Sequence, residues 1–167
     1  LAIDPAPATT AISDTIDTTT VSLAATPSVA EGGSIVYTAS LGNVAQSPVS
    51  VTLSNGGVIT IAAGASSGSI SVAAPADDVY LDAGSVFATI ASAVGGNFEV
   101  LAIDPTPAAT TVSDTLDTTT VSITGDSSVT EGASANYTVS LTSPALSDVT
   151  VDLAYSGTAA NGADFTG

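Results

Sequence analysis

The sequence predicts an all-β protein made of tandem immunoglobulin-like β-sandwich repeats of about 100 residues, arranged end to end. The first observation is an internal repeat. LAIDPAPATTAISDTIDTTTVS at residues 1–22 returns as LAIDPTPAATTVSDTLDTTTVS at residues 101–122, an offset of 101 − 1 = 100 positions. The second is that apolar residues alternate with polar ones in short runs separated by Gly, Pro, Asn, Asp and Ser, which is typical of strands joined by tight turns. Seven such runs in one repeat suit a sandwich of this type.

Each strand of the first repeat is placed by its apolar positions, and the turn residues between the strands mark the breaks. In chain order the expected strands are 19–23, 35–41, 49–53, 58–61, 68–72, 86–90 and 98–103, the last running on more loosely to 112. The pair Asn55-Gly56 is typical of a hairpin turn. We therefore divide the chain into residues 1–17, the last strand and linker of a preceding repeat; residues 18–117, a complete repeat; and residues 118–167, the N-terminal part of a following, divergent repeat.

The composition excludes several classes of partner. The chain has no Lys, Arg or His against 16 acidic residues, a formal net charge of −16, yet 44% of its residues are hydrophobic. That apolar content is sufficient for a core, so the acidity does not predict disorder. Nucleic acids and anionic membrane surfaces are not expected as partners because binding them needs positive charge. No apolar run is long enough for direct membrane insertion.

An enzyme is not expected, because every serine lacks a histidine or lysine to act as its base. Only a carboxylate pair remains, as in glycoside hydrolysis. Asp77 and Asp78 could form such a pair, but adjacent acids in one short loop are better explained as metal ligands.

Six acidic residues are expected to meet at one end of the complete repeat. If successive strands alternate in direction, three of the loops share the end at which the last strand leaves, here called the exit pole. The acids expected there are Glu31, Asp77, Asp78, Asp82, Asp114 and Asp117. Without basic residues to offset their repulsion, they favour a hard cation with oxygen ligands, and Ca²⁺ suits irregular sites built from several loops. The alternative is that they are solvated turn formers. We interpret Asp4, Asp104 and Asp126 in that way, and Asp82 also fits an ordinary turn.

Three motifs together resemble the extender repeats of giant, type I-secreted RTX or LapA-like bacterial biofilm adhesins, which are built of bacterial Ig-like and Calx-β-like domains. They are SVAEGGSIVYTASL after a TTTVSL strand, PADDVYLDAG, and VSDTLDTTTVS. YSGTAANGADFTG is likewise similar to the strand C and D region of Calx-β-like repeats. The family's glycine-rich nonapeptide repeats are absent.

The resemblance implies an extracellular, calcium-rigidified stalk that projects adhesive modules from the cell surface for attachment and biofilm formation. Its partners would be calcium ions and the neighbouring repeats of the same chain; whether stalks associate laterally is left open. By resemblance, the linker acids Asp114 and Asp117 are ligands together with Glu31 and the paired Asp77 and Asp78. Three further acids would take the same roles at neighbouring sites: Glu131, Asp14 and Asp17.

The alternative function is a binding module, an Ig-like domain of an adhesin or phage appendage whose loops grip a glycan or protein. Such a face should expose aromatic residues or an apolar patch. Only Tyr80 and Phe87 lie near the acidic loop, and the chain has no Trp. A passive spacer is therefore the favoured interpretation.

Overall fold

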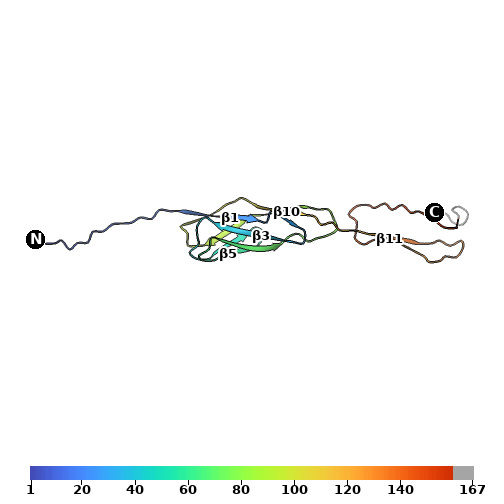
Figure 1. Ribbon diagram of the computed structural model, residues 1–167, viewed down its shortest axis with the longest axis horizontal. Helices are drawn as coiled ribbons and strands as arrows, with labels where there is room; N and C mark the ends of the chain where they lie inside the picture. Colours follow the sequence, from blue (N-terminus) through green and yellow to red (C-terminus); the bar gives the residue numbers. More distant parts are fainter. Residues whose placement is uncertain (160–167) are drawn as a thin grey trace. The chain divides into compact units, whose positions relative to one another are not determined.

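The computed structural model describes residues 1–159 and divides the chain into two compact units, residues 1–117 and the part from Thr118 onward (Figure 1). All regular structure in the described residues is β. No helix among them is long and apolar enough to cross a bilayer. In the first unit, residues 1–17 lie outside the strands and are exposed, and the sandwich begins at Thr18.

Ten strands form the first unit. They are β1 (Thr18–Ala25), β2 (Ser28–Ala30), β3 (Ser34–Leu41), β4 (Val49–Leu53), β5 (Val58–Ile61), β6 (Ser67–Ala73), β7 (Gly84–Ala88), β8 (Ile90–Gly95), β9 (Val100–Ile103) and β10 (Ala108–Ser113). One sheet has the order β6-β3-β1-β9. The other layer consists of two three-stranded sheets, β5-β4-β8 and β2-β10-β7, linked where β7 and β8 follow each other with only Thr89 between them.

The alternating pattern creates the core. Strand β3 buries alternate residues, Ile35, Tyr37, Ala39 and Leu41, while the residues between them are less buried or exposed. The same period in β1, β4 and β5 directs their apolar side chains inward, and together they form one hydrophobic cluster. Such a cluster holds the two layers together without salt bridges, which a chain lacking basic side chains cannot form.

The predicted all-β, Ig-like sandwich class is confirmed. The expected strands 49–53 and 58–61 have the bounds of β4 and β5. The last expected strand is interrupted between β9 and β10, where Pro105 and Pro107 each lack a backbone N–H. Sequence reasoning missed β2, a strand of three residues that exists by pairing in parallel with β10.

The second unit contains a two-stranded antiparallel sheet, β11 (Val121–Gly125) and β12 (Tyr137–Leu141). Its register repeats that of β1 and β3, since Val121 faces Leu141 as Val21 faces Leu41. The alternating run DVTVDL at 148–153 forms no strand. The YSGTAANGADFTG stretch extends into residues 160–167, which lie outside the described residues. The division of the chain at residues 17 and 117 stays a prediction.

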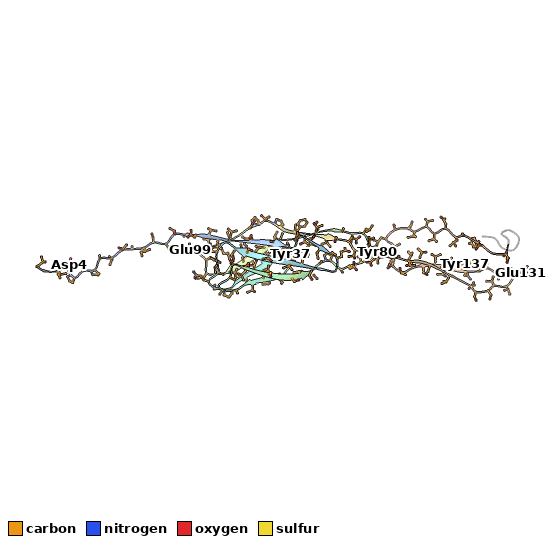
Figure 2. All side chains as sticks on the ribbon, in the orientation of Figure 1. Asp4, Tyr37, Tyr80, Glu99, Glu131 and Tyr137 are labelled. Carbon is orange, nitrogen blue, oxygen red and sulfur yellow. The ribbon has the colours of Figure 1, made fainter. Side chains whose placement is uncertain are left out.

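Tyr37 provides a test of core packing. Its side chain is 1% exposed, and its hydroxyl has no hydrogen-bond partner (Figure 2). Because an unpaired buried polar group costs about 1–3 kcal/mol, we expect Tyr37→Phe to be at least as stable as the parent, by up to about 1 kcal/mol. Urea unfolding would measure this, with Tyr137→Phe as control because Tyr137 is largely exposed. A clear loss of stability in Tyr37→Phe would contradict the expectation.

Candidate metal centre

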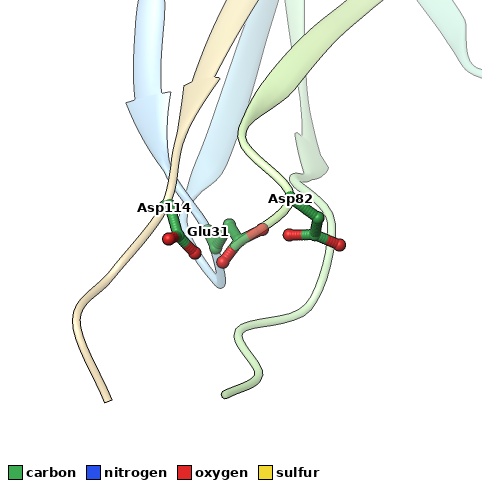
Figure 3. A group of neighbouring side chains, drawn as sticks. All are labelled: Glu31, Asp82 and Asp114. Carbon is green, nitrogen blue, oxygen red and sulfur yellow. The ribbon is translucent and has the colours of Figure 1, made fainter. Parts of the chain in front are cut away.

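Three carboxylates are brought together by the register of the sheet β2-β10-β7. In the parallel pair, Ala30 of β2 lies opposite Ser113 of β10, so the next residues, Glu31 and Asp114, are neighbours. In the antiparallel pair, Val112 lies opposite Gly84 at the start of β7, so Asp114 and Asp82 each lie two residues beyond the last paired positions. Neighbouring strands are about 4.8 Å apart. One row just past the strand ends therefore carries three acids (Figure 3).

The turn that carries Glu31 is fixed by backbone hydrogen bonds to both flanking segments. The Glu31 N–H donates to the Ser113 carbonyl at 3.0 Å, and the Gly32 N–H donates to the Pro75 carbonyl at 2.7 Å. Gly32 has φ +68°, a conformation that glycine adopts readily. A Cβ at Gly32 would lie 3.5 Å from the Cβ of Asp77, so the loop before β7 packs closely on this turn.

The three acids differ in burial but share a small volume. Glu31 is buried, Asp114 is half-buried and Asp82 is exposed, and one carboxylate oxygen from each lies within 4.8 Å of the others. Two oxygens, Glu31 Oε2 and Asp114 Oδ1, are buried without a hydrogen-bond partner. Buried acceptors are normally satisfied, so these two oxygens would be open to a hydrogen-bond donor or a cation.

The surroundings of Glu31 favour its protonated form. A hydrogen bond with the Asp82 carboxyl, desolvation, and repulsion by the charges of Asp82, Asp114 and Asp78 raise the pKa of Glu31 from 4.5 to about 7. In the absence of a cation, the site relieves its repulsion by holding a proton on Glu31.

The donor set fits calcium. Ca²⁺ binds oxygen ligands at about 2.3–2.6 Å, so two ligands on opposite sides of one ion are up to about 4.6–5.2 Å apart. The three carboxylate oxygens lie within 4.8 Å of one another, which is close enough for all three to reach a single ion. With no His or Cys in the chain, a zinc site is not favoured. Glu31, Asp82 and Asp114 could thus surround one hard cation, with further oxygens from solvent or nearby loops.

The other acids expected at the exit pole lie near this row or apart from it. The Asp77 carboxylate accepts a hydrogen bond from the Thr115 hydroxyl, which ties the loop before β7 to the segment after β10. Asp78 accepts a hydrogen bond from the Tyr80 N–H at 2.8 Å, as a turn-forming aspartate does. The group of three does not include Asp117, which is exposed.

The acids expected at neighbouring sites are all exposed. The Asp14 carboxylate accepts a hydrogen bond from the Thr15 N–H, and the backbone N–H of Asp17 donates to the Glu99 carboxylate. Sequence reasoning did not select Glu99. Glu131 lies in the turn of the second unit that corresponds to the turn of Glu31. None of these three predicted ligands belongs to the group formed by Glu31, Asp82 and Asp114.

The aspartates interpreted as turn formers make local hydrogen bonds. Asp4 accepts from the Ala6 N–H and Asp104 from the Thr106 N–H. The Thr106 hydroxyl and N–H lower the pKa of Asp104. Asp126 accepts from the backbone and side-chain N–H groups of Asn136 across the β11–β12 ladder.

A family model described as the LapA domain matches residues 17–115 and again residues 117–163. No curated protein and no solved structure matches the chain. The two matched segments meet close to the boundary between the compact units at Asp117.

Proposed function

The chain belongs to the LapA domain family, an adhesin family of the cell surface or extracellular space, and from this we propose that it is a calcium-rigidified extender segment of a large adhesin. The all-β sandwich and the absence of basic catalytic side chains support a structural role and not an enzyme. The adhesive modules that such a stalk would carry, its type I secretion and its part in biofilm formation belong to this proposal.

The single observation that carries the proposal is the row formed by Glu31, Asp82 and Asp114. Asp114 is the first residue after β10, and only three residues separate it from Thr118, where the second unit begins. A cation bound by Asp114 would therefore hold the start of the connecting segment against the sandwich. The Thr115–Asp77 hydrogen bond supports the same role, because it anchors the next residue. Calcium would restrict the connection and stiffen an array of such units.

The first experiment is a calcium titration of the calcium-free 167-residue chain by calorimetry, followed by melting curves in calcium and in chelator. Because an ion that binds only the folded state stabilises it by mass action, we expect heat of binding and a higher melting temperature in calcium. We expect Asp114→Asn to remove most of both responses. The same substitution at Asp126, which pairs with Asn136 far from the row in sequence, serves as the control.

A chain that melts at one temperature in calcium and chelator, and releases no heat on titration, would contradict the calcium site. If calcium binds but small-angle scattering of the chain does not change, the site exists without the mechanical role. The family membership would be unaffected in either case.

A further inference from the structure

The first and the last strands of the first unit run side by side in the same direction. β1 pairs in parallel with β9, and β2 pairs in parallel with β10 up to the last pair, Ala30 and Ser113. We call residues 18–30, which contain β1 and β2, the entry run, and residues 100–113, which contain β9 and β10, the exit run. Because the two runs are parallel, the chain enters the sandwich at one end and leaves it at the other (Figure 1).

Backbone hydrogen bonds join the two runs outside the strand ladders as well. Just after β9, the Asp104 N–H donates to the Val21 carbonyl at 2.9 Å. Just before β2, the Pro27 carbonyl accepts from the Thr111 N–H at 3.0 Å. The entry run and the exit run are therefore bonded to each other on both sides of the break between β9 and β10.

Thr110 of β10 adds a side-chain bond between the runs. It faces inward between Ala108 and Val112 and is 0% exposed. Its hydroxyl donates to the Thr26 carbonyl at 2.7 Å. Thr26 lies between β1 and β2, where the entry run passes from one sheet to the other. A buried hydroxyl needs a partner, and this one finds it in the other run, so an inward position of β10 fastens the two runs together.

Tension applied to the two sides of this unit would load the contact between the runs in shear. A pull on the N-terminal side draws the entry run back along its own axis, and a pull on the C-terminal side draws the exit run forward. Parallel strands then slide lengthwise, and the evenly spaced bonds between them share the load. Residues 31–99 lie inside the loop that this contact closes, so the force reaches them only after the contact breaks.

We propose that the first unit bears tension, and that the contact between the entry run and the exit run is the barrier to its unfolding under load. Forced unfolding is governed by the unfolding rate, which depends on the interactions that are lost in the transition state. The contact between the runs must be lost first, while the buried residues of β3, β4 and β5 are still shielded from the force. Load bearing goes beyond the proposed stiffening of the connecting segment, and it does not require bound calcium.

Single-molecule force spectroscopy of the 167-residue chain in chelator tests the proposal with two directions of pull on the same folded unit. The chain has no cysteine, so a pair of introduced cysteines defines the points of attachment. Ile16→Cys with Leu116→Cys, at exposed positions outside the strands, pulls the two runs lengthwise. Ser34→Cys with Leu116→Cys pulls from one end and opens the contact bond by bond, because Ser34 begins β3 just after the turn at Glu31. We expect a clearly higher unfolding force from the first pair; equal forces in the two directions would overturn the proposal.

Thr110→Val tests the contact itself, because valine keeps the shape of threonine and removes the hydroxyl donor. With attachment at residues 16 and 116, we expect this variant to unfold at a lower force than the parent. The matched control is Ile59→Val, which removes a methyl group from the core inside the closed loop. Urea unfolding in chelator should show that both variants are less stable, yet the unfolding force of Ile59→Val should equal that of the parent. If the force falls in both variants in proportion to their loss of stability, or if Thr110→Val leaves it unchanged, the contact between the runs is not the barrier.

Discussion

Glu31→Gln is expected to stabilise the calcium-free chain at neutral and alkaline pH and to remove its stabilisation by calcium. Glu31 is the most buried carboxylate of the row, and its charge is opposed by Asp82 and Asp114. The amide has nearly the same shape but no charge, so the repulsion falls while the turn is kept. A carboxylate ligand is lost at the same time, so calcium binds less tightly. Melting curves of both proteins in calcium and in chelator measure the two effects together.

The pH dependence of the calcium-free chain follows from the raised pKa of Glu31. Its pKa is about 7 in the folded state, raised from the ordinary value of 4.5. Between these values the folded state binds more protons than the unfolded state, so stability falls as pH rises through that window. Above about pH 7 the contribution of Glu31 no longer changes. Calcium needs the deprotonated carboxylate, so its affinity should rise with pH over the same range.

The matched control is Glu131→Gln, the same substitution at the corresponding turn of the second unit, where the glutamate is exposed. It should leave the pH profile and the calcium response of the first unit unchanged. If Glu31→Gln melts with the same pH profile as the parent in chelator, Glu31 does not carry the shifted pKa.

The alternation of apolar residues was sufficient to place most of the strands. It did not separate β7 from β8, because the expected strand 86–90 runs across Thr89. In β4, Val49, Val51 and Leu53 all face the core, as the period of two predicts. The strand β2 could not be predicted, because a strand of only three residues carries too little periodicity. Its stability comes from pairing with β10, more than 80 residues away.

The unpredicted strand β2 also explains why the sequence could place the acids at one pole but could not select the three that form the group. Alternating strand direction predicts that Glu31, Asp82 and Asp114 share a pole, and all three lie in one group. It does not distinguish them from Asp78 or Asp117, because loop residues at one pole are equivalent until the register is known. The register of β2, β10 and β7 makes the selection. Asp82, which also fitted an ordinary turn, belongs to the same group as Glu31 and Asp114.

The largest effect on stability is expected from a substitution at Ile59 of β5, and the adjacent residue Val58 provides the control. Ile59 is 0% exposed and lies opposite Val51, whereas Val58 points outward and is 48% exposed. Ile59→Ala should cost about 2–5 kcal/mol, because burial is lost and the rigid sandwich collapses only partly around the cavity. Domains of this size are stable by only about 5–15 kcal/mol, so the melting temperature should fall by many degrees.

Val58→Ala is the matched control for Ile59→Ala, since it removes methyl groups from the same strand on the opposite face. A surface change of this kind should alter the free energy of unfolding by no more than about 0.5 kcal/mol. Urea unfolding in chelator keeps any effect of calcium out of the comparison. Equal losses in the two variants would mean that both faces of β5 are covered, as they would be if a partner packed on the outer face. The difference in the free energy of unfolding between the two variants therefore shows which face of β5 packs against the core and stabilises the sheet of β5, β4 and β8.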